Sequence, residues 1–198
     1  YFCIVKEIKY DVAVVGGGIV GLATAYKFQL KYPTLNIIIL EKEKELAFHQ
    51  SGRNSGVIHS GLYYNPGSFR SKNCVDGRKQ LVEFAKKNQI NHDVCGKIVL
   101  ATNKIEQETL SELKTRGEQN GLIGLEIIGK ERIKEIEPFA EGVEALFVPE
   151  SGIIDYKGVT NKLADLIVQI NPTSKIQTSC EVLNVKDEVL LTNQGNIQ

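Results

Sequence analysis

A glycine cluster near the start of the chain constrains the fold more than any other feature. The cluster reads GGGIVG at residues 16–21 and directly follows an apolar, β-branched run, YDVAVV, at residues 10–15. Apolar residues then recur at helical spacing over residues 19–31, and NIIIL at 36–40 forms a second apolar run. Residues 10–41 therefore predict a strand-helix-strand unit with a right-handed crossover.

Each glycine of this G-x-G-x-x-G pattern has a physical task in binding a dinucleotide. Gly16 permits a tight turn, Gly18 lets the backbone approach a pyrophosphate, and Gly21 lets helix and strand pack closely. The helix N-terminus offers free N–H groups and a partial positive charge to phosphates. Glu41 ends the second apolar run, where a carboxylate accepts hydrogen bonds from ribose hydroxyls and disfavours a 2′-phosphate. The pattern thus predicts NAD or FAD binding without choosing between them, and a glycine-rich turn that binds no nucleotide is the alternative.

The composition excludes several classes of protein. Of 198 residues, 42% are hydrophobic, and 24 Lys plus Arg balance 24 Asp plus Glu. Zero net charge argues against nucleic-acid binding, and no apolar run is long enough to cross a bilayer. Cys3, Cys74, Cys95 and Cys180 form no C-x-x-C pair and fit free thiols in a reducing compartment. Because the chain begins with Tyr and contains no Met, we expect a fragment or a processed chain.

The segment HQSGRNSGVIHSGLYY, residues 49–64, has an unusual composition. It contains two of the three histidines and no acidic residue, so it suits either a surface linker or a loop that wraps a cofactor. His49 and His59 lie ten residues apart, without H-x-x-x-H or H-E-x-x-H spacing, and no metal site is predicted. For His49, capping of a turn is the alternative to a role in a cofactor loop.

Five stretches together resemble a known family: YDVAVVGGGIVGLATAYKF, LEKEKELAFHQSGRNSGVIHSGLYY, CGK at 95–97, EP at 137–138 and SGIIDY at 151–156. The chain resembles the FAD-dependent oxidoreductases of the D-amino-acid-oxidase superfamily, and within it the L-2-hydroxyglutarate dehydrogenases. The resemblance implies FAD rather than NAD, and oxidation of L-2-hydroxyglutarate to 2-oxoglutarate. It implies a non-NAD electron acceptor, such as a membrane quinone or an electron-transfer protein. It also implies a chain about twice as long, located in mitochondria in eukaryotes and peripherally at the inner membrane in bacteria.

The resemblance also implies which residues bind the cofactor. The glycine cluster should line the pyrophosphate, Glu41 and Lys42 should meet the adenosine, and Val182 should meet the adenine. The segment after His49 should pass under the phosphates and flavin, with His59, Ser60 and Gly61 near the isoalloxazine ring. The full predicted cofactor-binding set is Gly16, Gly17, Gly18, Ile19, Val20, Gly21, Glu41, Lys42, His49, Ser51, Gly52, Asn54, Ser55, Gly56, Val57, Ser60, Gly61 and Val182.

His59 is the candidate catalytic residue. Oxidation of a 2-hydroxy acid requires loss of the hydroxyl proton, and an imidazole with a near-neutral pKa suits that transfer. Hydrogen bonding to the flavin or a covalent flavin link are alternatives for His59. The two substrate carboxylates call for Arg or Lys, and the sequence does not choose among Arg70, Lys72 and Lys97. Of Tyr63 and Tyr64, one should be in the core and the other at the mouth of the site.

The fold class expected is α/β. A Rossmann-like FAD-binding domain with a central parallel sheet should comprise residues 8–80 and 153–198, and residues 81–152 should begin an α+β substrate domain. Its antiparallel sheet is expected from three apolar stretches, at 95–102, 125–128 and 143–148. Two other functions remain open at this stage. One is an oxidoreductase of the same superfamily that acts on an amino acid or glycerol 3-phosphate, and the other is a non-catalytic FAD-binding fragment.

Overall fold

The computed structural model describes residues 9–198, so Cys3 and the predicted domain start at residue 8 lie outside the described residues. The chain divides into two compact units. The first comprises the chain up to Ser55 together with Tyr156–Gln198, and the second comprises Gly56–Asp155.

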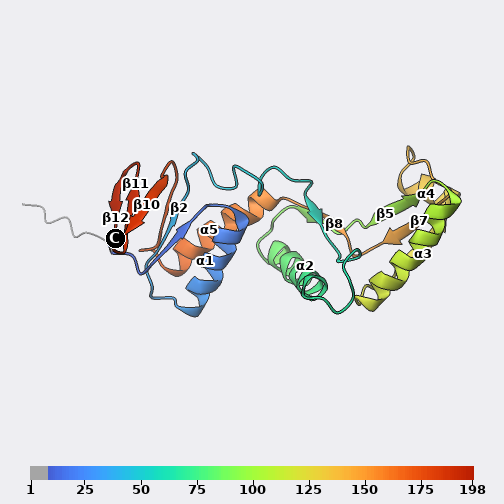
Figure 1. The fold of residues 1–198 in the computed structure, drawn as a ribbon, viewed down its shortest axis with the longest axis horizontal. Helices are drawn as coiled ribbons and strands as arrows, with labels where there is room; N and C mark the ends of the chain where they lie inside the picture. Colours follow the sequence, from blue (N-terminus) through green and yellow to red (C-terminus); the bar gives the residue numbers. More distant parts are fainter. Residues whose placement is uncertain (1–8) are drawn as a thin grey trace, which may run out of the picture. The chain divides into compact units, whose positions relative to one another are not determined.

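The first unit is built on a parallel sheet with the order β1-β2-β9. Every residue of the central strand β2 is buried, as expected for an apolar strand inside a parallel sheet. The two helices of this unit pack against each other beside the sheet (Figure 1). The elements are β1 (Val12–Val15), α1 (Ile19–Lys31), β2 (Ile37–Leu40), α5 (Tyr156–Ile170) and β9 (Lys175–Gln177).

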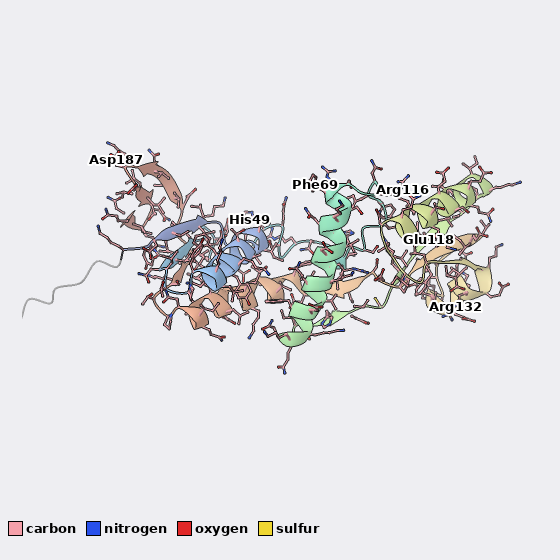
Figure 2. The ribbon with its side chains drawn as sticks, turned by 90° about the horizontal axis from the view of Figure 1, so that it is seen from below. His49, Phe69, Arg116, Glu118, Arg132 and Asp187 are labelled. Atoms are coloured by element: carbon pink, nitrogen blue, oxygen red, sulfur yellow. The ribbon has the colours of Figure 1, made fainter. Side chains whose placement is uncertain are left out.

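A small antiparallel sheet follows in the same unit, and its hairpin turn carries Asp187 (Figure 2). Its strands are β10 (Val182–Lys186), β11 (Val189–Thr192) and β12 (Gly195–Ile197). Val182 and Leu190 of this sheet pack on buried Ile38, Leu40 and Cys180. This packing brings the start of β10 to the carboxyl end of β2.

A buried glutamine joins α1 to the sheet. The side chain of Gln29 is fully buried, and its Nε2 atom donates to the carbonyls of Tyr32, Pro33 and Leu35. Its Oε1 atom accepts a hydrogen bond of 2.8 Å from Ser174 Oγ. The polar atoms of Gln29 are therefore paired, which removes the cost of burying them.

The second unit contains an antiparallel sheet with the order β5-β7-β6, with α3 against it (Figure 1). Its core includes Leu110, Leu113, Leu146 and Val148. Side chains cap two of its helices: Ser68 Oγ accepts from Ser71 N–H at the start of α2, and Asn103 does so for α3. The elements are α2 (Phe69–Lys87), β5 (Lys97–Ala101), α3 (Lys104–Gln119), β6 (Glu126–Gly129), α4 (Lys130–Ile136) and β7 (Glu144–Val148).

Three very short strands complete this unit in a separate sheet, with the order β3-β8-β4. They are β3 (Val57–Ile58), β4 (His92–Asp93) and β8 (Gly152–Ile154). The pairing of Ile58 with Gly152 joins the predicted flavin-loop segment to the SGIIDY stretch. The sequence did not predict these strands, because two or three residues carry no readable period.

The predicted fold class is confirmed. The predicted parallel strands form β1 and β2, and the three apolar stretches form the antiparallel β5, β6 and β7. The unit boundaries, at Ser55 and Asp155, differ from the predicted domain boundaries at 80 and 152. The segment 56–80 clusters with the second unit because β3 pairs with β8 and α2 follows it.

The prediction that one of Tyr63 and Tyr64 lies in the core is wrong. Tyr63 and Tyr64 are 54% and 37% exposed, and the neighbouring Leu62 is the buried residue, at 1%. The segment is a turn rather than an extended strand, so the alternation that underlay the prediction does not apply. In the portion of the chain that is described, no helix has the length and apolar character needed to cross a membrane.

Candidate functional site

The glycine turn after β1 has the geometry that its sequence predicts. Gly16 has a φ of 112°, a conformation that L side chains rarely adopt. A Cβ atom on Gly21 would lie 2.2 Å from the carbonyl oxygen of Gly16, so only glycine fits there. These two positions allow the chain to leave β1 and enter α1 within a few residues.

Glu41 fastens this turn to the end of β2. Its Oε2 atom accepts a 2.7 Å hydrogen bond from Gly17 N–H, and its Oε1 atom accepts one of 2.9 Å from Glu43 N–H. The backbone of Glu41 also donates to Gln177 and accepts from Cys180. One buried carboxylate thus ties together the glycine turn, β2 and the segment before β10.

Ser51 caps α1 from a distant part of the sequence. The residue at the N-cap position, Gly18, has no side chain, and Ser51 Oγ instead accepts a 2.9 Å hydrogen bond from Ile19 N–H. Ala47 N–H donates to the carbonyl of Gly17, which places the segment 46–51 against the glycine turn. The first turn of an α-helix has N–H groups without partners inside the helix, and such groups can bind an anion.

A cavity of about 320 Å³ lies at the carboxyl end of β1 and β2. The glycine turn, the 46–51 segment and the start of β10 enclose it. Its lining residues are Val15, Gly16, Gly18, Leu40, Glu41, Lys42, Ala47, Phe48, His49, Gln50, Ser51, Cys180, Glu181 and Val182. Ligands of open parallel sheets bind in this position, outside the carboxyl ends of the strands.

His49 lines this cavity and pairs with a nearby glutamate. Its Nε2 atom lies 2.7 Å from Glu43 Oε1, and its exposed ring (Figure 2) meets the ring of Phe48 edge-on. Arg53 lies on the same phenyl ring, 4.5 Å from its centroid. The His49 ring thus contacts side chains, and His49 also lines the cavity, so turn capping and a place in the cofactor loop both stay predictions for it.

The segment that contains His59 belongs to the second unit. The His59 side chain is exposed, and its carbonyl accepts a hydrogen bond from Cys74 Sγ. Burial raises the pKa of the Cys74 thiol, and nearby Arg78 partly offsets this. The next residue, Ser60, is 1% exposed, and its hydroxyl has no partner among residues 9–198.

Residues 11–197 of the chain match the family described as FAD dependent oxidoreductase, or DAO. The chain belongs to this family.

Curated relatives support a narrower similarity. The chain is 48% identical over 158 residues to the L-2-hydroxyglutarate dehydrogenase of Indibacter alkaliphilus, covering 80% of this chain and 40% of that protein. It is 43% identical to the mitochondrial L-2-hydroxyglutarate dehydrogenase of Caenorhabditis briggsae, covering 93% of this chain and 42% of that protein. The chain therefore spans less than half of the length of these relatives.

Solved structures agree with the family assignment. L-α-glycerophosphate oxidase of Mycoplasma pneumoniae, solved with FAD bound, has a TM-score of 0.83 and 30% identity, covering 94% of this chain and 50% of that one. Glycine oxidase of Geobacillus kaustophilus has a TM-score of 0.82 at 22% identity, covering 96% of this chain and 53% of that one, and shows the shared fold.

The residues of the first unit fit the FAD of this family. Gly18 leaves the cavity wall free of a side chain where α1 begins, and a Cβ atom there would meet Ser51 Oγ at 3.2 Å. A carboxylate and a lysine, Glu41 and Lys42, line the same cavity. The cavity therefore combines a helix N-terminus with an acidic side chain, the two groups that the dinucleotide sites of such folds use.

The predicted cofactor residues fall into three groups. Those that line the cavity are Gly16, Gly18, Glu41, Lys42, His49, Ser51 and Val182. Those of the same unit that lie outside its lining are Gly17, Ile19, Val20, Gly21, Gly52, Asn54 and Ser55. Those of the second unit are Gly56, Val57, Ser60 and Gly61, together with the catalytic candidate His59.

Other residues of the cavity wall were not predicted. Phe48 and Gln50 lie close in sequence to the predicted residues His49 and Ser51. They line the cavity because a turn folds the segment 46–51 against Gly17. Cys180 and Glu181 precede Val182 directly, and their sequence proximity to it was the available signal. Nothing local to these side chains indicates a site, because the cavity depends on pairing between distant segments.

Proposed function

We propose that the protein containing this chain oxidises L-2-hydroxyglutarate to 2-oxoglutarate with FAD as the oxidant. The observation that carries the proposal is the 43–48% identity to relatives named L-2-hydroxyglutarate dehydrogenase, from bacteria to animals. The similarity to L-α-glycerophosphate oxidase favours glycerol 3-phosphate as the second candidate substrate, at the lower identity of 30%.

The cavity of the first unit is the proposed site for the adenosine and pyrophosphate of FAD. Glu41 would accept hydrogen bonds from the ribose hydroxyls, because each of its oxygens keeps a free lone pair beside the backbone bond that it already accepts. The N-terminus of α1, with Gly18 and Ser51, would face the phosphates, and Lys42 and Val182 would flank the adenine. Residues 52–61 are proposed to continue along the cofactor, as the family resemblance implies.

When bound, FAD supplies an acceptor for the hydride that leaves C2 of the substrate. This chain would contribute a base for the hydroxyl proton, and His59 is the proposed group. Its ring has no hydrogen-bond partner within residues 9–198, so a ring nitrogen is available to take that proton. Hydrogen bonding to the flavin is the competing role for His59.

Anaerobic mixing of the FAD-loaded full chain with substrate tests the reaction. L-2-hydroxyglutarate is expected to bleach the flavin absorbance, whereas D-2-hydroxyglutarate and glycerol 3-phosphate are not. Bleaching by glycerol 3-phosphate alone would favour the second candidate. A flavin that no 2-hydroxy acid, amino acid or glycerol 3-phosphate reduces would make this a non-catalytic FAD-binding protein.

Replacement of His59 tests its role separately. His59→Ala is expected to lower the rate of flavin reduction by about 10²- to 10⁴-fold with FAD still bound, the usual contribution of a general base. His92→Ala is the matched control, because His92 bonds the carbonyl of Ile90 and serves the fold. A near-normal rate of flavin reduction in His59→Ala would rule out His59 as the general base.

The electron acceptor and the location in the cell are also proposals. Reoxidation by a quinone analogue or an electron-transfer protein, and not by NAD, is the expected pattern. Eukaryotic relatives are named mitochondrial, which supports a mitochondrial location if the source is a eukaryote. For a bacterial source we expect peripheral attachment at the inner membrane, which fractionation before and after a high-salt wash would test.

A further inference from the structure

Lys97 is half-buried and has no acidic partner among residues 9–198. It is the first residue of β5, and its Nζ atom lies 4.6 Å from the ring centroid of Tyr63. No ion pair with Lys97 occurs in the described part of the chain, whereas Lys134 and Lys157, both more exposed, each bind a glutamate. Burial lowers the pKa of the Lys97 ammonium, as expected when a charge loses water and gains no anion.

The Tyr63 ring positions this ammonium without neutralising it. A lysine over an aromatic face gains a modest electrostatic attraction, and the charge stays unbalanced. Most partly buried lysines extend their ammonium to water along an apolar stem. Tyr63 is itself 54% exposed, so an anion from solution can reach the pair.

The fold brings Lys97 to the segment that contains His59. Gly96 N–H, directly before Lys97, donates a 2.9 Å hydrogen bond to the carbonyl of Ser151. The adjacent Gly152 pairs with Ile58, directly before His59. Three stretches of the second unit therefore meet here: the end of β3, the start of β5 and the start of β8.

Two buried hydroxyls next to these stretches in the sequence have no hydrogen-bond partner in the described part of the chain. Ser60 and Ser151 are each 1% exposed, and neither Oγ atom has a hydrogen-bond partner among residues 9–198. Unpaired buried polar atoms are rare in proteins, and each calls for an explanation such as an ordered water, an ion or a catalytic role. Ser151 is the residue whose carbonyl accepts from Gly96 N–H, and Ser60 directly follows His59, so the two hydroxyls add a second observation to the ammonium of Lys97.

We propose that Lys97, held by the ring of Tyr63, binds one carboxylate of the dicarboxylate substrate. This inference rests on the proposed function, since the substrate's charge comes from it. An ammonium with three donors that is already partly dehydrated binds a carboxylate more strongly than a fully hydrated one does. The alternative is a lysine that only packs on Tyr63.

Substrate kinetics with the FAD-loaded full chain give the first measurement. Lys97→Met is expected to raise the KM for L-2-hydroxyglutarate by about 10- to 100-fold, the loss of a hydrogen bond to a charged group, with a smaller change in kcat. Lys97→Arg is expected to recover part of the loss, and Lys87→Met, an exposed lysine at the end of α2, is the matched control. Equal KM values for Lys97→Met and the control would overturn the proposal.

Competitive labelling keeps the test independent of turnover and of variant folding. The wild-type full chain, loaded with FAD, is treated with limiting acetic anhydride, and acetylation at each lysine is measured by peptide mass spectrometry. Saturating glutarate is expected to protect Lys97 several-fold and to leave Lys87 unchanged, with sodium chloride of equal ionic strength as the control. Protection without flavin reduction by L-2-hydroxyglutarate would retain the carboxylate site and reject the proposed reaction. Flavin reduction without protection would retain the reaction and reject the role of Lys97.

Discussion

The carboxylate of Glu41 accepts a 2.7 Å hydrogen bond from the backbone N–H of Gly17, across the end of the parallel sheet. Its second oxygen accepts from Glu43 N–H, and the residue is 8% exposed. Charge-assisted bonds of this kind are about twice as strong as neutral ones. The acid that the motif assigns to a ribose is therefore also a structural support of the turn that would receive the phosphates.

Glu41→Gln should affect stability and FAD binding together. The amide keeps the shape of the side chain, yet its NH₂ group faces one of the two N–H donors, so a bond is lost. We expect the free energy of unfolding to fall by about 1–3 kcal/mol, and FAD affinity to fall at least tenfold. Urea denaturation and flavin fluorescence titration measure these two quantities.

The control for this variant is Glu45→Gln, which breaks an exposed ion pair with Lys157. Its effect on stability is expected to stay within about 0.5 kcal/mol, with FAD affinity unchanged. Equal FAD affinities in the two variants would contradict the proposed role of Glu41.

Gly21→Ala should destabilise the protein although alanine favours helices. Its Cβ would lie 2.2 Å from the Gly16 carbonyl oxygen, and a backbone atom cannot rotate away. Gly77 is the matched control, because it is also helical and a Cβ there meets nothing within 4 Å. We expect Gly21→Ala to lower the free energy of unfolding by about 1–3 kcal/mol. Gly77→Ala should raise it by about 0.5–1 kcal/mol, because alanine has the higher helix propensity and the lower chain entropy when unfolded. Urea midpoints that shift in the same direction would show that the contact at Gly21 is relieved at little cost.

Arg78 and Glu150 form an ion pair whose contribution to the free energy of unfolding should depend on pH. Burial raises the pKa of Glu150, and hydrogen bonds from Arg78 and Ile123 N–H outweigh it, so the pKa lies below its ordinary value of 4.5. Ionised Glu150 therefore contributes stability above that value, and the contribution is lost as the pH falls through its folded-state pKa. Arg78→Met should lower stability near pH 7 by about 2–3 kcal/mol, less than for a fully buried pair, because Glu150 is 26% exposed.

The comparison across pH isolates this pair from other acids. Glu106 and Glu141 also have lowered pKa values, but Arg78 is not the cause. The pKa of Glu106 is lowered by hydrogen bonds from Thr102, and that of Glu141 by Lys134. Urea midpoints of wild type and Arg78→Met should converge as the pH drops from 7 to 3. A constant difference over that range would show that Arg78 acts through packing rather than through the charge of Glu150.

The sequence predicted the elements better than their buried faces. Apolar spacing correctly outlined α1, yet the apolar Leu30 is 50% exposed while the polar Gln29 is fully buried. Gln29 is held by Ser174, 145 residues away, and such a partner leaves no local signal. Likewise Ile105 of α3 is 79% exposed, although Leu110 and Leu113 of the same helix are buried.

The same distinction applies to the candidate site. The glycine turn and Glu41 were predictable, because one short motif carries both the turn and its acid. The cap from Ser51 to Ile19 N–H, the buried Arg78 and the contact of Lys97 with Tyr63 were not. Each of these depends on two segments far apart in the sequence, and their side chains have no period that would reveal the partner.

Two serines that cap helices allow the cofactor role of Ser51 to be separated from its structural role. Ser51 Oγ accepts from Ile19 N–H at the start of α1, and Ser68 Oγ accepts from Ser71 N–H at the start of α2. Loss of either cap is expected to lower the free energy of unfolding by about 1 kcal/mol, the usual effect of replacing a capping serine by alanine.

Ser51 also lines the cavity where α1 begins, and Ser68 does not. Ser51→Ala should therefore weaken FAD binding, while Ser68→Ala keeps wild-type affinity. Fluorescence titration without urea, at a temperature where both variants are folded, measures the two affinities. If both serine variants bind FAD as wild type does, Ser51 serves the helix alone and the cofactor contact proposed for it must be abandoned.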